Sequence, residues 1–373
     1  MFKLIERPMT DQSKPAEDGR NSKTLTLAEY GWSAHFQAQL DVSDVKTMLP
    51  VRVMAVHRNG IDVAGPDYQG RIAPIASAVE NAGPAGATVG DWLLIDRASR
   101  AAQRVLERKS LFRRKAAGPT VRVQLIAANV DTLFIVSSCN QDFNPARIER
   151  YLAIARTAAV TPVIILTKAD LASDVEALVA QAARLAHGLL IEALDARSPD
   201  IARRLSMWCA PGQTVALMGS SGVGKSTLLN TLSGDVVQAT AEIRAGDDKG
   251  KHTTTRRSLH RLAGGAWLID TPGMRELQLT NVEEGLNSVF ADVAELAAQC
   301  RFSDCLHDTE PGCAVRAALH DGRLDEARLK RYRKLLREEA RNTETLAEAH
   351  ARIRSFSRQV RSSMKAKRDR GSS

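Results

Sequence analysis

The sequence predicts a multidomain protein: a small β-barrel, then an α/β domain built on a parallel sheet, then a small α-helical module. Three observations predict this order. Five short β-type runs separated by turns lie between residues 50 and 108. Buried-strand patterns alternate with helix patterns from 131 to 269. After about residue 280 the strand patterns stop, and cysteines cluster between helical segments.

Composition excludes the secreted and membrane classes. The 373 residues, 44% of them apolar and 25% charged, suffice for two or three folded domains. We find no apolar run near the ~20 residues of a membrane helix and no signal-peptide pattern in Met1–Lys23. Five cysteines are too few and odd in number for a disulfide scaffold, so we expect a cytoplasmic protein.

Residues 1–47 are predicted to be a flexible tail followed by a short docking segment, Leu27–Leu40, which contains Tyr30, Trp32 and Phe36. The barrel and a basic linker are expected over 48–117. The five β-type runs are Val51–Val56, Ile61–Val63, Gly70–Ile75, Trp92–Asp96 and Gln103–Leu106. An OB-fold that binds RNA fits them, and an SH3-like barrel would give the same pattern. Leu111–Gly118 has the composition of a basic linker.

Positive charge is concentrated in two places. From Gly322 to Ser373 there are 16 Lys and Arg against 7 Asp and Glu, an excess equal to the whole chain's net charge of +9. Arg97–Arg122 carries nine basic residues and one acid. Two such runs favour a nucleic-acid partner, although a single run is as often a solvated helix face.

The α/β domain is expected over 118–282. Asp131–Ser138, Pro162–Leu166, Gln213–Met218 and Ala266–Ile269 are its predicted buried strands. Asn144 and Pro145 predict a helix start, and Ser173 with Glu176 predicts a capping box at another.

A phosphate-binding loop follows one of these strands. Gly219–Ser226 fits G-x-x-x-x-G-K-[ST] between a strand and a helix, the context that gives the motif its meaning. Lys225 is expected to contact the β- and γ-phosphates, and Ser226 to bind Mg²⁺. The predicted contact residues are Gly219, Ser220, Ser221, Gly222, Val223, Gly224, Lys225, Ser226 and Thr227.

Asp270-Thr-Pro-Gly273 ends a later strand. We expect Asp270 to hold Mg²⁺ through water and the Gly273 N–H to approach the γ-phosphate. Between the two motifs, one of Thr253, Thr254 and Thr255 is predicted to be a switch hydroxyl, with Thr254 placed in the site.

Guanine recognition is predicted at Thr167-Lys-Ala-Asp170, directly after a strand. A carboxylate at Asp170 can accept from guanine N1–H and N2–H₂, and the Lys168 stem can pack on the base. Thr167 stands where Asn is commonest in GTPases, a change expected to weaken guanine affinity. The loop behind the base has its nearest match at Ala193–Asp195.

The motif order is that of a circularly permuted GTPase, because the guanine motif precedes the phosphate loop and Asp270–Gly273. Met274 occupies the position where many GTPases have a water-orienting Gln, so intrinsic hydrolysis should be slow. His252 is a candidate to orient the water, although a lone loop histidine is more often only solvated.

The C-terminal module is expected over 283–373. Cys300-x₄-Cys305-x-His307-x₅-Cys313 supplies three thiols and one imidazole, a closed tetrahedral set for one structural Zn²⁺. Basic helices follow, with six Lys and Arg within ten residues: Arg328, Lys330, Arg331, Arg333, Lys334 and Arg337. We expect one helix face to pack and the other to meet phosphate.

The chain resembles the circularly permuted GTPases of the YjeQ/RsgA type over about residues 28–340. Beside the phosphate and guanine motifs, the resemblance includes Gly31, Trp32 and Phe36, the run Ala127–Asp131 and His252-Thr-Thr-Thr255. It implies an N-terminal OB-fold, a permuted GTPase domain, a zinc module, and rRNA contact with GTP hydrolysis stimulated by the small ribosomal subunit during late maturation.

The leading hypothesis is therefore a monomeric GTP hydrolase that acts on the small ribosomal subunit with Mg²⁺ and one structural Zn²⁺. A non-enzymatic GTP-binding assembly factor and a P-loop ATPase or kinase are the alternatives. Intact Lys225, Ser226 and Asp270 disfavour the first alternative, and Asp170 disfavours the second.

Overall fold

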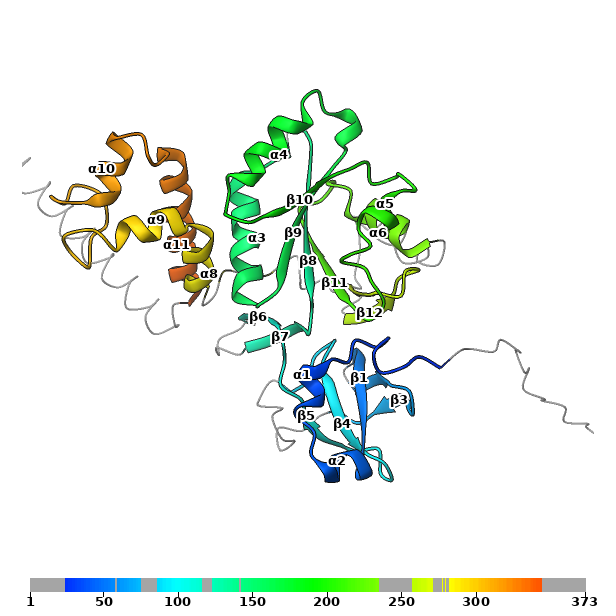
Figure 1. Ribbon diagram of the computed structural model, residues 1–373. Coiled ribbons are helices and arrows are strands. Elements are labelled where there is room, and N and C mark those ends of the chain that lie inside the picture. The colour runs from blue at the N-terminus through cyan, green and yellow to red at the C-terminus, as the bar shows by residue number, and fades with distance from the viewer. Residues whose placement is uncertain are drawn as a thin grey trace, which may run out of the picture.

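The computed structural model shows a β-rich N-terminal unit, a central α/β unit and a helical C-terminal module (Figure 1). It describes residues 24–57, 59–74, 86–115, 123–140, 142–234, 257–270, 277, 279 and 282–343. Within those ranges, no helix has both the length and the apolar character needed to cross a membrane.

The N-terminal unit is organised around its longest strand, β1 (Met48–His57). It pairs antiparallel with β2 (Gly60–Ala64) on one side and with β4 (Trp92–Asp96) on the other. β3 (Gln69–Ile72) extends the sheet beyond β2, and β5 (Ala102–Val105) extends it beyond β4. The five predicted β-type runs are thus all strands, in the order β3-β2-β1-β4-β5.

Two short helices flank this sheet, α1 (Ala34–Gln37) and α2 (Val42–Thr47). The α1 segment carries the predicted aromatic residues into the core. The rings of Trp32 and Phe36 lie 4.8 Å and 5.8 Å from the ring of the fully buried Trp92. Aromatic burial of this size holds the segment against the N-terminal sheet.

A hairpin connects the N-terminal and central units, and it corrects the prediction of a basic linker. β6 (Leu111–Lys115) pairs antiparallel with β7 (Val123–Ala128), so part of Leu111–Gly118 is strand. Sequence analysis missed β6 because three of its five residues are basic. Phe112 of this strand is nevertheless buried in the core. The hairpin also spans the predicted domain boundary at 117/118.

The central sheet is built from five parallel strands. Its order, β10-β9-β8-β11-β13, differs from their order along the chain. The strands are β8 (Thr132–Ser138), β9 (Thr161–Thr167), β10 (Leu190–Ala193), β11 (Thr214–Met218) and β13 (Trp267–Asp270). Every residue of β8 is buried, as expected of a parallel strand covered on both faces.

A sixth strand, β12 (Arg257–Arg261), joins the two sheets into one. It pairs antiparallel with β13 on one edge and with β1 on the other, where Ala55 lies opposite Ser258. Its mostly polar sequence gave no apolar strand signal. The pairing fixes the N-terminal unit on the edge of the central sheet.

Arg52 of β1 reinforces this junction from inside the protein. Its Nη1 donates to the Tyr30 carbonyl and its Nη2 to Thr214 Oγ1, both at 2.6 Å. Burial lowers the pKa of Arg52 to about 10, against the opposing charges of Asp131 and Asp91, so the guanidinium remains protonated at neutral pH. Since Thr214 begins β11, this charge links the N-terminal unit to the strand that leads into the phosphate loop.

Two helices of the central unit begin after a side-chain cap. α3 (Pro145–Thr157) begins after Asn144, whose side chain accepts from the Arg147 N–H as predicted. α4 (Val175–Ala183) begins after Asp174, not after the predicted Ser173. The Asp174 carboxylate accepts from the Ala177 N–H at 2.8 Å, and a charged acceptor at a helix N-terminus is favoured by the helix dipole. A short helix, α5 (Ile201–Arg204), and α6 (Lys225–Ser233) complete this unit.

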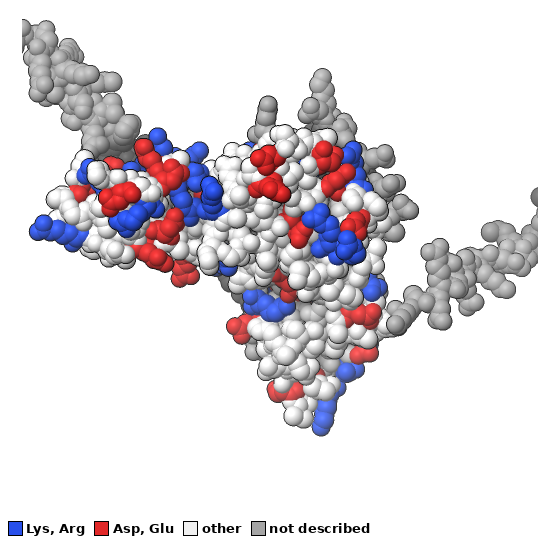
Figure 2. Space-filling model, turned by 45° about the horizontal axis from the view of Figure 1, so that its top comes forward, with Lys and Arg blue, Asp and Glu red and all other residues white. Residues whose placement is uncertain are grey.

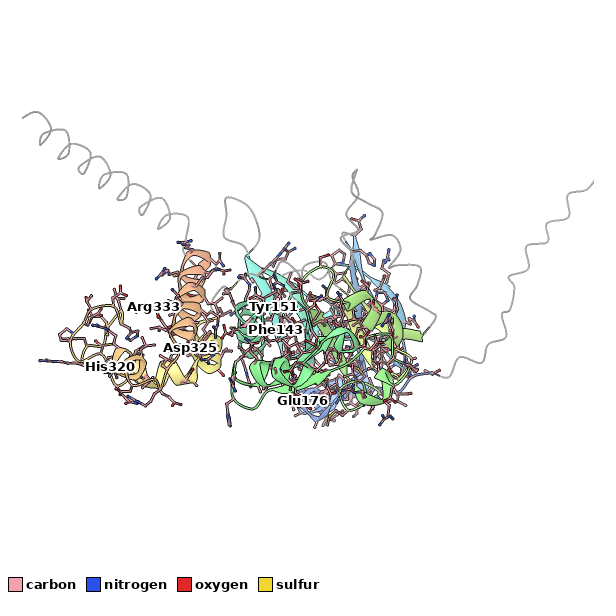
Figure 3. The ribbon with its side chains drawn as sticks, turned by 90° about the horizontal axis from the view of Figure 1, so that it is seen from above. Phe143, Tyr151, Glu176, His320, Asp325 and Arg333 are labelled. Carbon is pink, nitrogen blue, oxygen red and sulfur yellow. The ribbon has the colours of Figure 1, made fainter. Side chains whose placement is uncertain are left out.

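The C-terminal module is helical, as predicted for the chain after about residue 280. It contains α8 (Glu283–Val289), α9 (Ala291–Ala297), α10 (Ala314–His320) and α11 (Glu326–Thr343). In the view of Figure 3, Phe143 and Tyr151 lie on the side of the central unit that faces this module. α8 approaches α3 so closely that a Cβ on Gly285 would lie 2.3 Å from the Ala153 carbonyl oxygen.

Several basic residues of α11 hold the C-terminal module in place. Part of the positive charge that was predicted to face phosphate is therefore used inside the protein. Arg328 Nη1 and Arg331 Nε donate to the two carboxylate oxygens of the buried Glu149 on α3, at 3.1 Å and 2.8 Å. Arg333 donates to the carbonyls of Leu306 and His307. Three of the six clustered cations therefore serve intramolecular contacts. A buried carboxylate requires such partners because leaving its charge unpaired would be costly.

Candidate nucleotide and metal sites

The phosphate loop lies between β11 and α6, as the motif requires. Gly219, Gly222 and Gly224 have φ values of +157°, +79° and +90°, a region that L side chains rarely adopt. A Cβ at Gly219 would also lie 2.3 Å from the Val136 carbonyl oxygen. The glycines therefore permit the turn that leads into the N-terminus of α6, where backbone N–H groups can bind phosphate.

The side chains of this loop are arranged as an anion site. Lys225 Nζ donates to the Gly219 carbonyl at 2.8 Å and to the Ser220 carbonyl. Ser226 and Thr227 are exposed in the first turn of α6. Both hydroxyls are accessible to a phosphate or to a phosphate-bound cation, and the ammonium group lies across the start of the loop.

The guanine motif lies directly against the phosphate loop. Thr167 Oγ1 donates to the Val223 carbonyl at 2.6 Å, and Lys168 Nζ donates to the Gly222 carbonyl at 2.9 Å. Thr167 is fully buried at the end of β9, so a hydroxyl can make this link in place of the commoner Asn amide. These two hydrogen bonds join positions that are 56 and 54 residues apart in the sequence.

Asp170 lies in a short 3₁₀ helix, η1 (Ala169–Leu171), with its side chain 30% exposed. Arg197 Nη2 donates to Asp170 Oδ2 at 2.8 Å, and the same guanidinium donates to Asp195. The hydrogen bond from Arg197 lowers the pKa of Asp195. Sequence analysis did not identify Arg197, although it lies two residues beyond the predicted Ala193–Asp195 loop. A guanine base bound at Asp170 has to replace or accommodate this arginine.

Part of the predicted magnesium and switch site lies outside the described residues. This applies to His252, Thr253, Thr254, Thr255, Gly273 and Met274, and to the side chain of Asp270. The Asp270 backbone is described at the end of β13, where it pairs with Ser258. Because β13 runs parallel to β11, with Ile269 opposite Ala216, the carboxyl ends of both strands reach the same edge of the sheet.

The Cys/His cluster forms a compact group of four ligand atoms. The Sγ atoms of Cys300 and Cys313 are 3.8 Å apart, and His307 Nδ1 lies 3.6 Å and 3.5 Å from them. With Cys305, all four ligand atoms lie within 4.8 Å of one another. A tetrahedral ion with Zn–S of about 2.3 Å and Zn–N of about 2.1 Å requires S···S near 3.8 Å and S···N near 3.6 Å. These residues therefore fit a single tetrahedral metal ion.

Comparison with known proteins identifies the family. The RsgA GTPase family model matches residues 105–280. A small ribosomal subunit biogenesis GTPase RsgA 2 of Vibrio vulnificus is 49% identical over 341 residues, 91% of this chain and 96% of the relative. An RsgA of Mesorhizobium japonicum is 50% identical over 88% of this chain and 94% of its own length. The chain belongs to the RsgA GTPase family.

Solved structures agree with the fold of this RsgA GTPase. A crystal structure of YjeQ from Thermotoga maritima shares 26% identity and a TM-score of 0.56, covering 78% of this chain and 98% of that one. YloQ, described as a circularly permuted GTPase, shares the fold with a TM-score of 0.55 at 24% identity, over 80% and 96% of the two chains. The permuted order predicted from the motifs is thereby confirmed.

Proposed function

We propose that this GTPase acts on the small ribosomal subunit during late maturation and that the subunit stimulates its hydrolysis of GTP. The observation that carries the proposal is identity at about half of all positions with relatives named for small ribosomal subunit biogenesis, across 91% and 94% of this chain. The family is one of GTPases, which disfavours a purely GTP-binding assembly factor. We also propose that the protein is cytoplasmic and monomeric on the subunit.

At the nucleotide site, we propose that backbone N–H groups of 219–226 bind the phosphates and that Lys225 contacts the β- and γ-phosphates. Mg²⁺ would be held by Ser226, with Thr254 and Asp270 completing its surroundings, and Gly273 would approach the γ-phosphate. Mg²⁺ supplies charge neutralisation at the transferred phosphate. His252 stays a proposed water-orienting residue. The contacts of Thr167 and Lys168 with the phosphate loop support this assembly.

At the Cys/His cluster, we propose one structural Zn²⁺ bound by Cys300, Cys305, His307 and Cys313. The ligand spacing supports it, since a closed Cys₃His set leaves no open position for catalysis. Metal analysis of the purified chain tests the assignment. About one zinc per chain is expected, and less than half an equivalent would contradict it.

We propose that the five-stranded N-terminal unit is an OB-fold and an RNA-binding domain. Its strand order supports this, because a Greek-key barrel needs a first strand paired with both the second and the fourth. Arg104 and Arg108, however, pair with Asp44 and Asp91, and Lys109 pairs with Asp131. Fewer cations of the run 97–122 are therefore available to RNA than its composition suggests.

We propose that α11 provides an rRNA-binding surface. On the face shown in Figure 2, Lys and Arg side chains gather on the C-terminal module with acidic groups between them. Four exposed cations at helical spacing define the α11 stripe: Lys330, Lys334, Arg337 and Arg341. Residues spaced by four, three and four lie on one helix face. Across the described residues these four side chains have no acidic partner, so they are available for phosphates.

The proposal is tested by measuring GTP hydrolysis with and without purified small ribosomal subunits. We expect slow hydrolysis alone and an increase of about 10-fold or more with small subunits, because residues supplied at the subunit would complete the site. Large subunits at equal concentration are the control. Equal rates with both kinds of subunit would refute the claim of specific activation.

A further inference from the structure

The start of helix α3 lies beside the phosphate loop. Asn144 Oδ1 accepts from the Arg147 N–H at 3.1 Å, and Pro145 occupies the first helical position. Both features fix the backbone of this first turn. Arg147, which no sequence motif marks, therefore extends from a backbone that the cap and the proline hold in place.

The side chain of Arg147 reaches the second residue of the phosphate loop. Its Nη1 donates to Ser220 Oγ at 2.7 Å, and Asp142 Oδ1 lies farther away, at 3.8 Å. The side chain is 37% exposed. Among the described residues, the closest polar partner of the Arg147 guanidinium is thus the neutral Ser220 hydroxyl. The more distant Asp142 compensates its charge only weakly.

A second cation contacts the backbone of Ser220. Lys225 Nζ donates to the carbonyls of Gly219 and Ser220. In a phosphate loop of this type, the lysine reaches the β- and γ-phosphates. The Ser220 end of the loop therefore lies toward the terminal phosphate.

We propose that Arg147 is a positioning residue for GTP hydrolysis that acts through Ser220. Its guanidinium holds Ser220 Oγ, and thereby the first half of the phosphate loop, in the conformation that receives the γ-phosphate. The inference rests on the GTPase activity of the family and is independent of the ribosomal partner. The Arg147–Ser220 contact should then stabilise bound GTP more than bound GDP, because GDP lacks the terminal phosphate. If the Arg147–Ser220 contact only stabilised the fold, it would stabilise the GTP complex and the GDP complex equally.

The experiment compares Arg147→Gln, Ser220→Ala and the double variant in the full chain without ribosomal subunits. Single-turnover GTP hydrolysis and the dissociation constants of GTP and GDP are measured for each. We expect Arg147→Gln to slow hydrolysis about 5- to 20-fold and to weaken GTP more than GDP, as loss of a charge-assisted hydrogen bond at a half-exposed site implies. Ser220→Ala should give a similar loss. The double variant should be no slower than the slower single variant, because both remove one interaction.

Two further variants distinguish a role of Arg147 in positioning Ser220 from a role in folding. Arg147→Lys keeps a donor and a charge and should restore hydrolysis to within about 3-fold of the wild type. Arg156→Gln changes an exposed arginine in the last turn of the same helix and should leave rate and affinities unchanged.

Three outcomes would overturn the proposal. The first is an unchanged hydrolysis rate in Arg147→Gln, and the second is an equal loss of GTP and GDP affinity in that variant. The third is a hydrolysis rate in the double variant that is reduced by the product of the two single-variant factors. Failure of small subunits to stimulate the wild type would refute the proposed function and leave these comparisons intact, because none of them contains a subunit.

Discussion

At the residue scale, two side chains of the predicted guanine motif have different surroundings. Thr167 is buried and bonded to the Val223 and Ser137 carbonyls, so its hydroxyl has a structural role at the junction of two loops. Asp170 is partly exposed at the loop surface, where its carboxylate can meet a ligand. The expectation that Thr167 weakens guanine affinity stays a prediction.

Asp170→Asn is expected to change the preferred nucleotide from GTP to XTP. Guanine presents two donors, N1–H and N2–H₂, which a carboxylate accepts and an amide cannot accept together. Xanthine has a carbonyl at C2, which the Asn amide can donate to while it accepts from N1–H. We expect GTP affinity to fall about 100-fold or more, since a buried donor is left unpaired, and XTP affinity to rise.

Equilibrium binding of GTP and XTP measures this change. Asp200→Asn is the control, because it removes an ion pair of the exposed Arg203 and lies outside both segments that are predicted to contact the base. Retention of GTP preference in Asp170→Asn would show that this carboxylate does not read the base.

At the element scale, α3 is the helix through which the C-terminal module attaches to the central unit. α8 approaches α3 at Gly285, where any larger residue would clash with the Ala153 carbonyl and Thr157. α11 is held by the ion pairs of Arg328 and Arg331 with Glu149, and Arg150 pairs with Glu338. Apolar packing and charge pairing thus act on the same helix.

Glu149→Gln is expected to destabilise the protein by about 3 kcal/mol. Burial raises the pKa of Glu149, although the hydrogen bond from Arg331 and the charges of Arg331 and Arg328 oppose it. A neutral amide at position 149 would leave Arg331 without its carboxylate partner, whereas Arg328 keeps Asp292. Urea unfolding measures the change.

Glu326→Gln, on the exposed first turn of α11, is the control and should lie within about 0.5 kcal/mol of the wild type. A Glu149→Gln midpoint equal to that of the control would contradict the role assigned to this cluster.

At the scale of the whole molecule, the central unit is joined both to the N-terminal unit and to the C-terminal module. The N-terminal unit joins through β12 and Arg52, and the C-terminal module joins through α3. Both junctions involve an element next to the phosphate loop, since Thr214 begins β11 and Arg147, in the first turn of α3, contacts Ser220. RNA bound at either neighbour could in this way influence the nucleotide site.

The α11 stripe is expected to contribute to rRNA affinity in proportion to its charge. Replacing Lys330, Lys334 and Arg337 by Gln should weaken binding about 10- to 100-fold at 100 mM salt and lower the slope of log K against log salt by about 2 to 3. Binding to purified small subunits over a salt series measures both quantities. The exposed Arg203 and Arg204 of α5, which pair with Asp200 and Glu192, provide a control double variant. An unchanged slope in the triple variant would place the rRNA surface elsewhere.

The sequence by itself determined the strands of the N-terminal unit, the permuted order of the GTPase motifs, the phosphate loop and the Cys/His cluster. These depend on local patterns: period-two alternation, buried apolar runs, glycine-dependent turns and metal-ligand spacing. Motif order along the chain is a property of the sequence alone, so the permutation needed no coordinates.

Tertiary structure alone decided which charges act on one another. The cations of α11 and of 97–122 look alike in the sequence, yet Arg328, Arg331 and Arg108 have acidic partners in the fold, and Lys334 and Arg337 remain exposed. Arg147, Arg197 and β12 likewise acquire their roles through residues up to 203 positions away, as Ala55 opposite Ser258 illustrates. Long-range contacts leave no local pattern, because a charged side chain is polar whether its partner is water, phosphate or a carboxylate brought near by folding.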